Sequence, residues 1–401
     1  MKFLPNLIKT PTLEESDDDE YYGTIAVSAG DRWFGYVLAW SLLELQGDHK
    51  KYNVRVISRV HNNLTDDLHK KGAEIVSIDY GRSETLETAL GHVGWLVFVS
   101  EMAPDRVKLA RALTDAAKKV DVSNIITISM LGAGDSKAQS LVDFRDIERA
   151  VESSARNWVT LRNSFLNQRF FHFERRIKEN SMLTISVNAD SRWAPIDLDD
   201  LVSALSFLAI DDNGLLRPGL EDKHQRRIYT LTGPELVSGP IVANEINLAI
   251  KSPHAVKFSE VTREDLEDYL LGKDKGSKER NKDLFRGLEQ RKTRHFNYPK
   301  PAPLNPAEVT AILDFFDYVK SGRAGYLSGD VKAITNEEPK RMTYFFRDNS
   351  DSFRPNPKRN NYRQSQRGYD DDEYERRQEY YEDDGYLRRE RVRDRKFRSK
   401  F

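Results

Sequence analysis

The sequence contains no cysteine among its 401 residues. This absence excludes disulfide bonds, cysteine-ligated zinc, iron–sulfur clusters and thiol catalysis. Long apolar runs are also missing, since no stretch approaches the roughly 18–20 residues that cross a bilayer. Residues 1–22 lack a secretory apolar region and carry an acidic block, which argues against a signal or transit peptide. We therefore expect a soluble protein of the cytoplasm, with the nucleus as an alternative and with no membrane contact.

An excess of charge of one sign is missing too, because 63 basic residues stand against 64 acidic ones. That balance excludes a uniformly basic nucleic-acid binder and a uniformly acidic solvating protein. The charges are unevenly placed, however. Residues 346–401 hold 16 basic and 13 acidic side chains, with six tyrosines and almost no aliphatic residues. A segment of this composition predicts a disordered tail.

Within that tail an acidic block at 370–384 precedes a basic block at 388–401. One interpretation is a solvated tether. The others are contact with RNA or an acidic protein through arginine and tyrosine, and a nuclear localisation patch in the basic block.

From residue 23 the chain alternates short apolar stretches with helical patterns whose apolar residues recur every three or four positions. Near-continuous apolar strands that alternate with helices predict a parallel sheet covered on both faces. The fold class is therefore α/β, a doubly wound Rossmann-like sheet. The predicted strands cover 23–28, 53–58, 73–80, 94–100, 124–129 and 158–163.

The pattern loosens after about residue 180, which predicts a smaller C-terminal α+β subdomain for a substrate or partner. Within it, residues 272–300 are dense in charge and poor in apolar side chains, and we expect an exposed insertion there. The predicted regions are an acidic flexible N-terminus at 1–22, a dinucleotide-binding core at 23–180, the subdomain at 181–345 and the tail at 346–401.

Several blocks carry a resemblance to a known family. The turn SAGDRWFG follows the first strand, VRVISR forms the second strand with a closing arginine, and IERAVESSARNWVTLRNSFL leads into the sixth. In this order, over roughly residues 23–346, they resemble the NmrA-like group of atypical short-chain dehydrogenases/reductases. The resemblance implies a Rossmann fold that binds NADP(H) at the turn after the first strand.

The family has glycines at three positions of this turn, and here they are occupied by Ala29, Arg32 and Gly35. The glycines allow a tight turn, close approach of the backbone to the pyrophosphate, and packing of helix on strand. Ala29 is a mild change, whereas Arg32 either crowds the phosphate, turns outward or pairs with it as a cation. We expect weak or degenerate NADP(H) binding. The resemblance assigns the contacts of the turn to Ala29, Gly30, Arg32, Trp33, Phe34 and Gly35.

Two further residues of the resemblance follow the second and third strands. Arg59 suits the 2′-phosphate of a ribose and so favours NADP over NAD, with an exposed loop arginine as the alternative. Asp79 stands where an adenine contact lies in the family, or caps the next helix.

The Tyr-x-x-x-Lys pair of active relatives is missing, since Ser140 and Phe144 occupy its positions. That pair acts as an acid/base in hydride transfer. Ser129 follows the fifth strand and is interpreted as a strand-end hydroxyl. The eight histidines show no zinc-site spacing. We therefore expect no catalytic residues and no metal.

The leading interpretation is a non-catalytic regulatory or interaction module with a protein partner, for which a homodimer is one option. Two alternatives stay open. The first is an NADP-dependent reductase with a non-standard proton donor. The second is an RNA- or protein-associating factor that acts through its tail.

Overall fold

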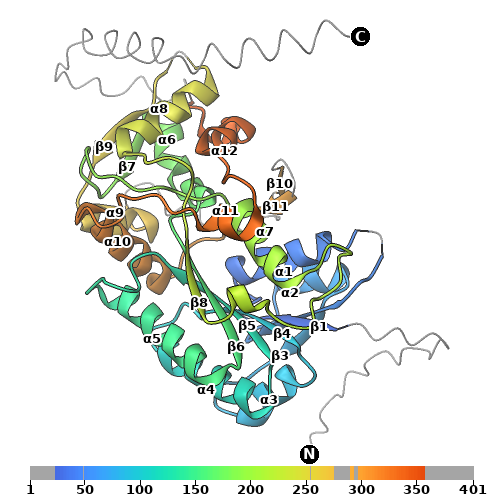
Figure 1. The fold of residues 1–401 in the computed structure, drawn as a ribbon. Coiled ribbons are helices and arrows are strands. Elements are labelled where there is room, and N and C mark those ends of the chain that lie inside the picture. Colours follow the sequence, from blue (N-terminus) through green and yellow to red (C-terminus); the bar gives the residue numbers. More distant parts are fainter. Residues whose placement is uncertain (1–22, 48, 253, 275–289, 293–296, 357–401) are drawn as a thin grey trace, which may run out of the picture. The chain divides into compact units, whose positions relative to one another are not determined.

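The computed structural model describes residues 23–47, 49–252, 254–274, 290–292 and 297–356. A seven-stranded sheet with the strand order β3-β2-β1-β4-β5-β6-β8 forms its centre (Figure 1). Each neighbouring pair in it is parallel, which confirms the predicted doubly wound α/β fold. The strands are β1 (Thr24–Val27), β2 (Asn53–Ser58), β3 (Glu74–Ser77), β4 (Trp95–Val99), β5 (Asn124–Met130), β6 (Asn157–Asn163) and β8 (Arg227–Leu231).

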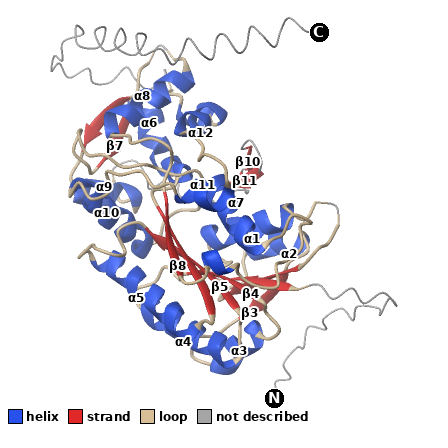
Figure 2. Ribbon diagram, in the orientation of Figure 1, coloured by secondary structure: helices blue, strands red, loops and turns tan. Residues whose placement is uncertain are grey.

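Helices cover both faces of this sheet (Figure 2). Alternate residues of each strand point to opposite faces, so Val97 of β4 packs with the helices of one face and Leu96 with those of the other. The first face carries α1 (Trp33–Glu44), α2 (Asn63–Lys70), α7 (Leu198–Ala209) and α11 (Asp330–Thr335). The second carries α3 (Ser83–Leu90), α4 (Arg106–Lys119) and α5 (Gln139–Ser154).

Helix α1 is apolar almost all the way round because it packs against the sheet and also against α7. Tyr36, Val37 and Trp40 are accordingly buried. None of the helices in the described ranges, including the 12-residue α1, is both long and apolar enough to cross a membrane.

The strand order changes direction between β1 and β4, which are neighbours in the sheet although β2 and β3 separate them in the chain. At such a point the loops after the two strands run to opposite faces, and a crevice opens at their carboxyl ends. This topology decides where a ligand site is expected.

The C-terminal part surrounds a second core rich in phenylalanine. Phe165 and Phe170 stack with Phe315 and Phe346, with ring centroids 5–6 Å apart. The elements that pack around this core are η1 (Asn167–Phe173), α6 (Glu174–Asn180), β7 (Met182–Ile185), α8 (Gly239–Ile250), β9 (Lys257–Glu260), α9 (Arg263–Leu270), α10 (Pro306–Lys320), α12 (Met342–Asp348) and α13 (Ser350–Phe353). The remaining elements are η2 (Asp222–His224), β10 (Gln290–Lys292) and β11 (Asn297–Pro299).

The folded part extends beyond the predicted start of the tail at residue 346. Phe346 and Phe353 are fully buried in the phenylalanine core, so the predicted boundary is about ten residues too early. The sequence missed this because these aromatic residues stand among charged ones. The rest of the predicted tail, the N-terminus at 1–22 and most of the charged insertion lie outside the described residues.

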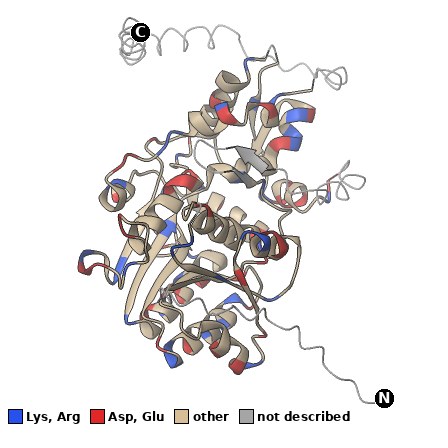
Figure 3. Ribbon diagram, turned by 90° about the vertical axis from the view of Figure 1, so that its right-hand side faces the viewer, with Lys and Arg blue, Asp and Glu red and all other residues tan. Residues whose placement is uncertain are grey.

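Acidic and basic residues are interspersed along the described ribbon (Figure 3). Many of them form partly exposed ion pairs, such as Arg55 with Glu74 at 2.8 Å. Pairs of this kind contribute little to stability. The charged residues of the folded part therefore form a mixed, solvated surface, as the balanced composition indicates.

Candidate cofactor and substrate cleft

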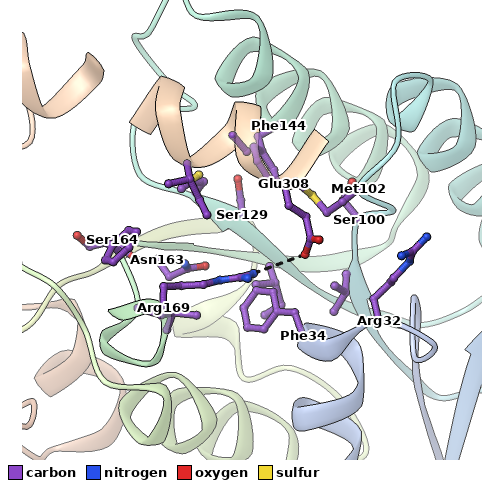
Figure 4. Close-up of a pocket in the computed structure, with 17 residues that line it drawn as sticks. Arg32, Phe34, Ser100, Met102, Ser129, Phe144, Asn163, Ser164, Arg169 and Glu308 are labelled. Atoms are coloured by element: carbon purple, nitrogen blue, oxygen red, sulfur yellow. Dashed lines mark hydrogen bonds and ion pairs between the residues drawn. The ribbon is translucent and has the colours of Figure 1, made fainter. Parts of the chain in front are cut away.

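A cleft lies at the carboxyl ends of β1, β4, β5 and β6, beside the point where the strand order reverses (Figure 4). It encloses about 780 Å³, counting space that is open to solvent. Helix α10 covers it from the C-terminal part. Apolar side chains make up most of its wall, and the lining residues are Arg32, Phe34, Val99, Ser100, Met102, Ile128, Ser129, Met130, Phe144, Asn163, Ser164, Phe165, Leu166, Arg169, Glu308, Ala311 and Ile312.

Two glycines hold the turn between β1 and α1 in a close-packed form. A Cβ on Gly30 would lie 2.1 Å from Cγ1 of Val56, and one on Gly35 would lie 2.3 Å from the carbonyl oxygen of Ala29. Both distances are far below van der Waals contact, so neither position accepts a side chain. Gly35 therefore has the helix-packing role that the family's third glycine supplies.

The strained residue of the turn is Ala29, not Arg32. Ala29 has φ +54°, in the left-handed region that favours glycine. Arg32 has φ −112° and ψ 152°, an extended conformation open to any residue. The expectation that Ala29 is the milder of the two changes is therefore wrong for the backbone.

The side chain of Arg32 is exposed and points away from Arg169 and Glu308 (Figure 4). Of the alternatives stated for it, the outward orientation is the one observed. An arginine in this orientation leaves the space in front of the turn free. Its pairing with a phosphate stays a prediction.

The first turn of α1, whose Phe34 lines the cleft, has backbone N–H groups without a partner inside the helix. The first bond of the helix runs from the Tyr36 amide to the Arg32 carbonyl, so the amides of Trp33, Phe34 and Gly35 have no partner inside the helix. The Arg32 side chain makes no capping bond within the described part of the chain, and the first turn has no acidic residue. An uncapped helix start of this kind favours an anion such as a pyrophosphate. The turn thus fits a dinucleotide, despite its missing glycines.

Arg59 and Asp79 lie at the neighbouring strand ends. Arg59 is exposed directly after β2, with its guanidinium 5.8 Å from the ring centroid of Tyr80. Asp79 accepts a hydrogen bond of 2.8 Å from the Gly81 amide, which stabilises the turn before α3. The N-cap position of α3 is Arg82, without a side-chain capping bond, so the alternative of Asp79 as a helix cap is wrong. Its adenine contact stays a prediction.

Two buried carboxyl groups at this end of the sheet were not predicted. Asp31 follows β1 and Glu101 follows β4, and each has one side-chain oxygen with no hydrogen-bond partner in the described structure. Burial is the main cause that raises the pKa of Asp31. Burial, with Asp31 nearby, raises the pKa of Glu101 to about 7. A sequence signal existed, since both acids stand within four residues of a predicted strand end.

The positions of the missing acid/base pair have other uses here. The Ser140 hydroxyl donates to Asp314 of α10 at 2.5 Å, and Phe144 forms part of the cleft wall. The Ser129 hydroxyl donates to buried Glu148 at 2.6 Å, in agreement with its interpretation as a structural hydroxyl. None of the described residues that line the cleft is a tyrosine or a lysine.

In the parts of the chain that the structure describes, His, Asp and Glu form no group of three that could hold a metal. Arg169 and Glu308 face each other across the cleft at 3.9 Å (Figure 4). Sequence reasoning missed this pair because its members lie 139 positions apart and come from different elements.

The model of the NAD(P)H-binding family matches residues 41–180. This stretch of the chain is similar to the NAD(P)H-binding family. The match confirms the predicted NAD(P)-binding, Rossmann-like domain, and the family description agrees with the predicted cofactor. It begins after the turn at 29–35, which is where the sequence departs from the glycine pattern.

Three of the similar proteins are reductases or oxidoreductases by name. The NAD(P)H azoreductase of Xenophilus azovorans is 26% identical over 207 residues, which cover 51% of this chain and 68% of that protein. The NADPH-dependent quinone oxidoreductase of Escherichia coli, in its complex with NADPH, is 17% identical with a TM-score of 0.60, over 80% of this chain and 98% of that one. The triphenylmethane reductase of Citrobacter sp., complexed with NADP(H), is 17% identical with a TM-score of 0.61, over 81% of this chain and 99% of that one. At this identity the two structures show the shared fold.

Proposed function

We propose that this protein is an NADP(H)-dependent reductase of flat, conjugated acceptors such as quinones or azo compounds. The observation that carries the proposal is the continuity of the cleft. Its apolar part adjoins the uncapped start of α1, so a dinucleotide and an aromatic acceptor would share one space. The names of the relatives support the reductase alternative over the non-catalytic interpretation.

The residues of the turn and its neighbours would bind the cofactor, which supplies a hydride when it is bound. The amides of Trp33, Phe34 and Gly35 would receive the pyrophosphate, and Arg59 would receive the 2′-phosphate. Phe144 is the substitution that shapes the acceptor part. It replaces a charged lysine with an apolar wall, which excludes water and favours an aromatic ligand.

The missing tyrosine restricts the chemistry to acceptors that need no acid from the protein. A quinone that takes up a hydride becomes a hydroquinone anion, which gains its proton from water. The hydride carries two electrons and one proton, and water supplies the second proton, so the reduction balances without a Tyr–Lys pair. A simple ketone is a poorer acceptor at this site, because its alkoxide needs a proton donor nearby.

Two measurements test the proposal. Calorimetric titration of NADPH and NADH into the full chain should show binding, with Arg59→Gln weakening NADPH about tenfold and leaving NADH unchanged. Steady-state oxidation of NADPH should then occur with a quinone or an azo dye and not with a ketone. Arg149→Gln, an exposed arginine on α5, is the matched control.

Each negative result has its own meaning. Binding of NADPH without oxidation by any acceptor would favour the non-catalytic module. No binding of either nucleotide would contradict the proposal and leave the fold as a scaffold.

A further inference from the structure

Arg169 is held in the cleft by the phenylalanine core. It lies on η1, where Gln168 before it and Phe170 after it in the chain are both buried. Its own side chain is only 15% exposed, and its guanidinium lies 5.0 Å from the ring centroid of Trp33. The anchored backbone therefore directs a buried positive charge into the cleft next to the start of α1.

This guanidinium is poorly coordinated for a buried charge. A guanidinium has five N–H donors, yet Oε1 of Glu308 lies 3.9 Å away, beyond hydrogen-bond distance. The other contact is a ring nitrogen of His172 at 3.4 Å. Burial, together with Arg169, holds the pKa of His172 well below 6.5, so this ring is neutral. Most of the donors of Arg169 have no acceptor within hydrogen-bond distance in the described structure.

Glu308 is engaged elsewhere. Its Oε2 accepts the backbone N–H of Asn305 at 3.0 Å, and its own N–H donates to the Asn305 side chain at 2.9 Å, which together form a capping box at the start of α10. The carboxylate is fixed by the cap, so it neutralises Arg169 at a distance without coordinating it.

The other walls of the cleft agree with an anionic ligand that has an apolar body. Arg169 brings a positive charge into the cleft and Glu308 brings one negative charge, while Arg32 lies at the edge of the lining with its side chain turned outward. Asn163 and Ser164 also line the cleft, and their Oδ1 and Oγ atoms are buried without a hydrogen-bond partner in the described structure. Buried polar atoms of a native fold are rarely left unpaired, so these two residues bring unsatisfied polar groups to the wall of the cleft.

We infer that Arg169 is the anion-binding residue of this cleft, and that Glu308 is a resident counter-charge which the anionic oxygen of a flat ligand replaces. That oxygen comes from the pyrophosphate of the dinucleotide or from an acid group on the acceptor. The inference rests on the proposed function for the nature of the ligand. Its test needs only binding and no turnover.

The experiment compares Arg169→Gln, Glu308→Gln and the control Arg149→Gln in the full chain. Glutamine at 308 keeps the capping box and removes only the charge. Calorimetry without cofactor uses three probes. ADP-ribose carries the pyrophosphate, anthraquinone-2-sulfonate carries an acid group on a flat ring system, and 2-(hydroxymethyl)anthraquinone is its neutral analogue.

Arg169→Gln should weaken one or both anionic probes by about tenfold or more, as the loss of a charged hydrogen-bond partner requires. Glu308→Gln should tighten the same probe severalfold, because the competing carboxylate is gone. The neutral analogue and the control variant should stay within about twofold of the unmodified protein. If Arg169→Gln weakens ADP-ribose alone, the oxygen belongs to the dinucleotide. If it weakens anthraquinone-2-sulfonate alone, the oxygen belongs to the acceptor.

The inference is overturned if Arg169→Gln leaves both anions unchanged, if the unmodified protein binds neither, or if Glu308→Gln weakens binding as much as Arg169→Gln does. Arg169→Lys covers the case in which the glutamine variant does not fold. It keeps the charge and loses the planar fork, so a smaller loss is expected. Absence of NADPH oxidation would contradict the proposed function and leave these binding results standing.

Discussion

Glu101 should make the protein less stable as the pH rises. Its carboxyl is buried after β4, one of its oxygens has no hydrogen-bond partner in the described structure, and its pKa is raised from 4.5 to about 7. The folded protein therefore retains a proton that the unfolded chain releases above pH 4.5. Stability from this group is complete below pH 4.5 and is lost as the pH rises to about 7. Each tenfold change in the acid constant is worth about 1.4 kcal/mol, so the total loss is roughly 3 kcal/mol.

Glu101→Gln removes this loss, since a neutral amide of nearly the same shape replaces the carboxyl. Between pH 5 and pH 8 the free energy of unfolding should fall by about 2–3 kcal/mol more in the unmodified protein than in the variant. Urea denaturation at the two pH values measures the difference. Asp200, whose pKa burial also raises to about 7, is present in both proteins, so its contribution cancels.

The control for this experiment is Glu338→Gln, which alters a carboxylate that is 69% exposed and pairs with Lys332 at the surface. Its pH dependence should match that of the unmodified protein. Parallel stability curves for the Glu101 variant and the unmodified protein would refute the reasoning, because they would show that Glu101 titrates near its ordinary value in the fold.

Three further substitutions test the turn and the sheet. Ala29→Gly should raise the free energy of unfolding by about 0.5–1 kcal/mol, because relief of the left-handed conformation exceeds the added freedom of the unfolded chain; a lower urea midpoint would contradict it. Gly35→Ala should lower the free energy of unfolding by about 1–3 kcal/mol and abolish the NADPH binding measured by calorimetry, since the new Cβ would collide with the backbone of Ala29. Unchanged binding would show that the turn shifts freely. Glu148→Ala should lower the thermal midpoint through a loss of about 3–5 kcal/mol, because Arg162 and Ser129 lose a buried partner at 2.6–2.8 Å; a loss below about 1 kcal/mol would show that water replaces the carboxylate.

The fold was predictable because each strand of the parallel sheet shows its own local apolar pattern in the sequence. β2 begins and ends at the predicted residues 53 and 58, and β5 differs by one residue. Such strands are apolar on both faces, so their signal does not depend on distant parts of the chain. The end of the folded part was less predictable, because Phe346 and Phe353 are buried only through contacts with a core formed by distant residues.

The site was predictable only where position along a strand decides it. The turn after β1 and Arg59 after β2 could be located from the strand pattern. The conformations of Ala29 and Arg32 could not, since φ depends on how the whole turn packs on Val56 and Gly35. The role of Arg169 could not be predicted from the sequence either. It depends on the distance between Arg169 and Glu308, which the fold determines and neither segment shows alone.

The two ends of the crevice carry buried charges of opposite sign, and only one of them changes near neutral pH. At the end near Arg59, Asp31 and Glu101 are buried acids, and with a pKa of about 7 Glu101 is half protonated near neutral pH. A phosphate that approaches Arg59 there meets less negative charge below pH 7 than above it. At the other end, Arg169 stays positive throughout this range. NADPH affinity should therefore rise as the pH falls from 8 to 7, a range in which the 2′-phosphate stays a dianion, and Glu101→Gln should remove most of that rise. ADP-ribose, which lacks the 2′-phosphate, should show a smaller pH dependence in the same titrations. An equal dependence for both ligands would place the effect at the pyrophosphate and away from Glu101.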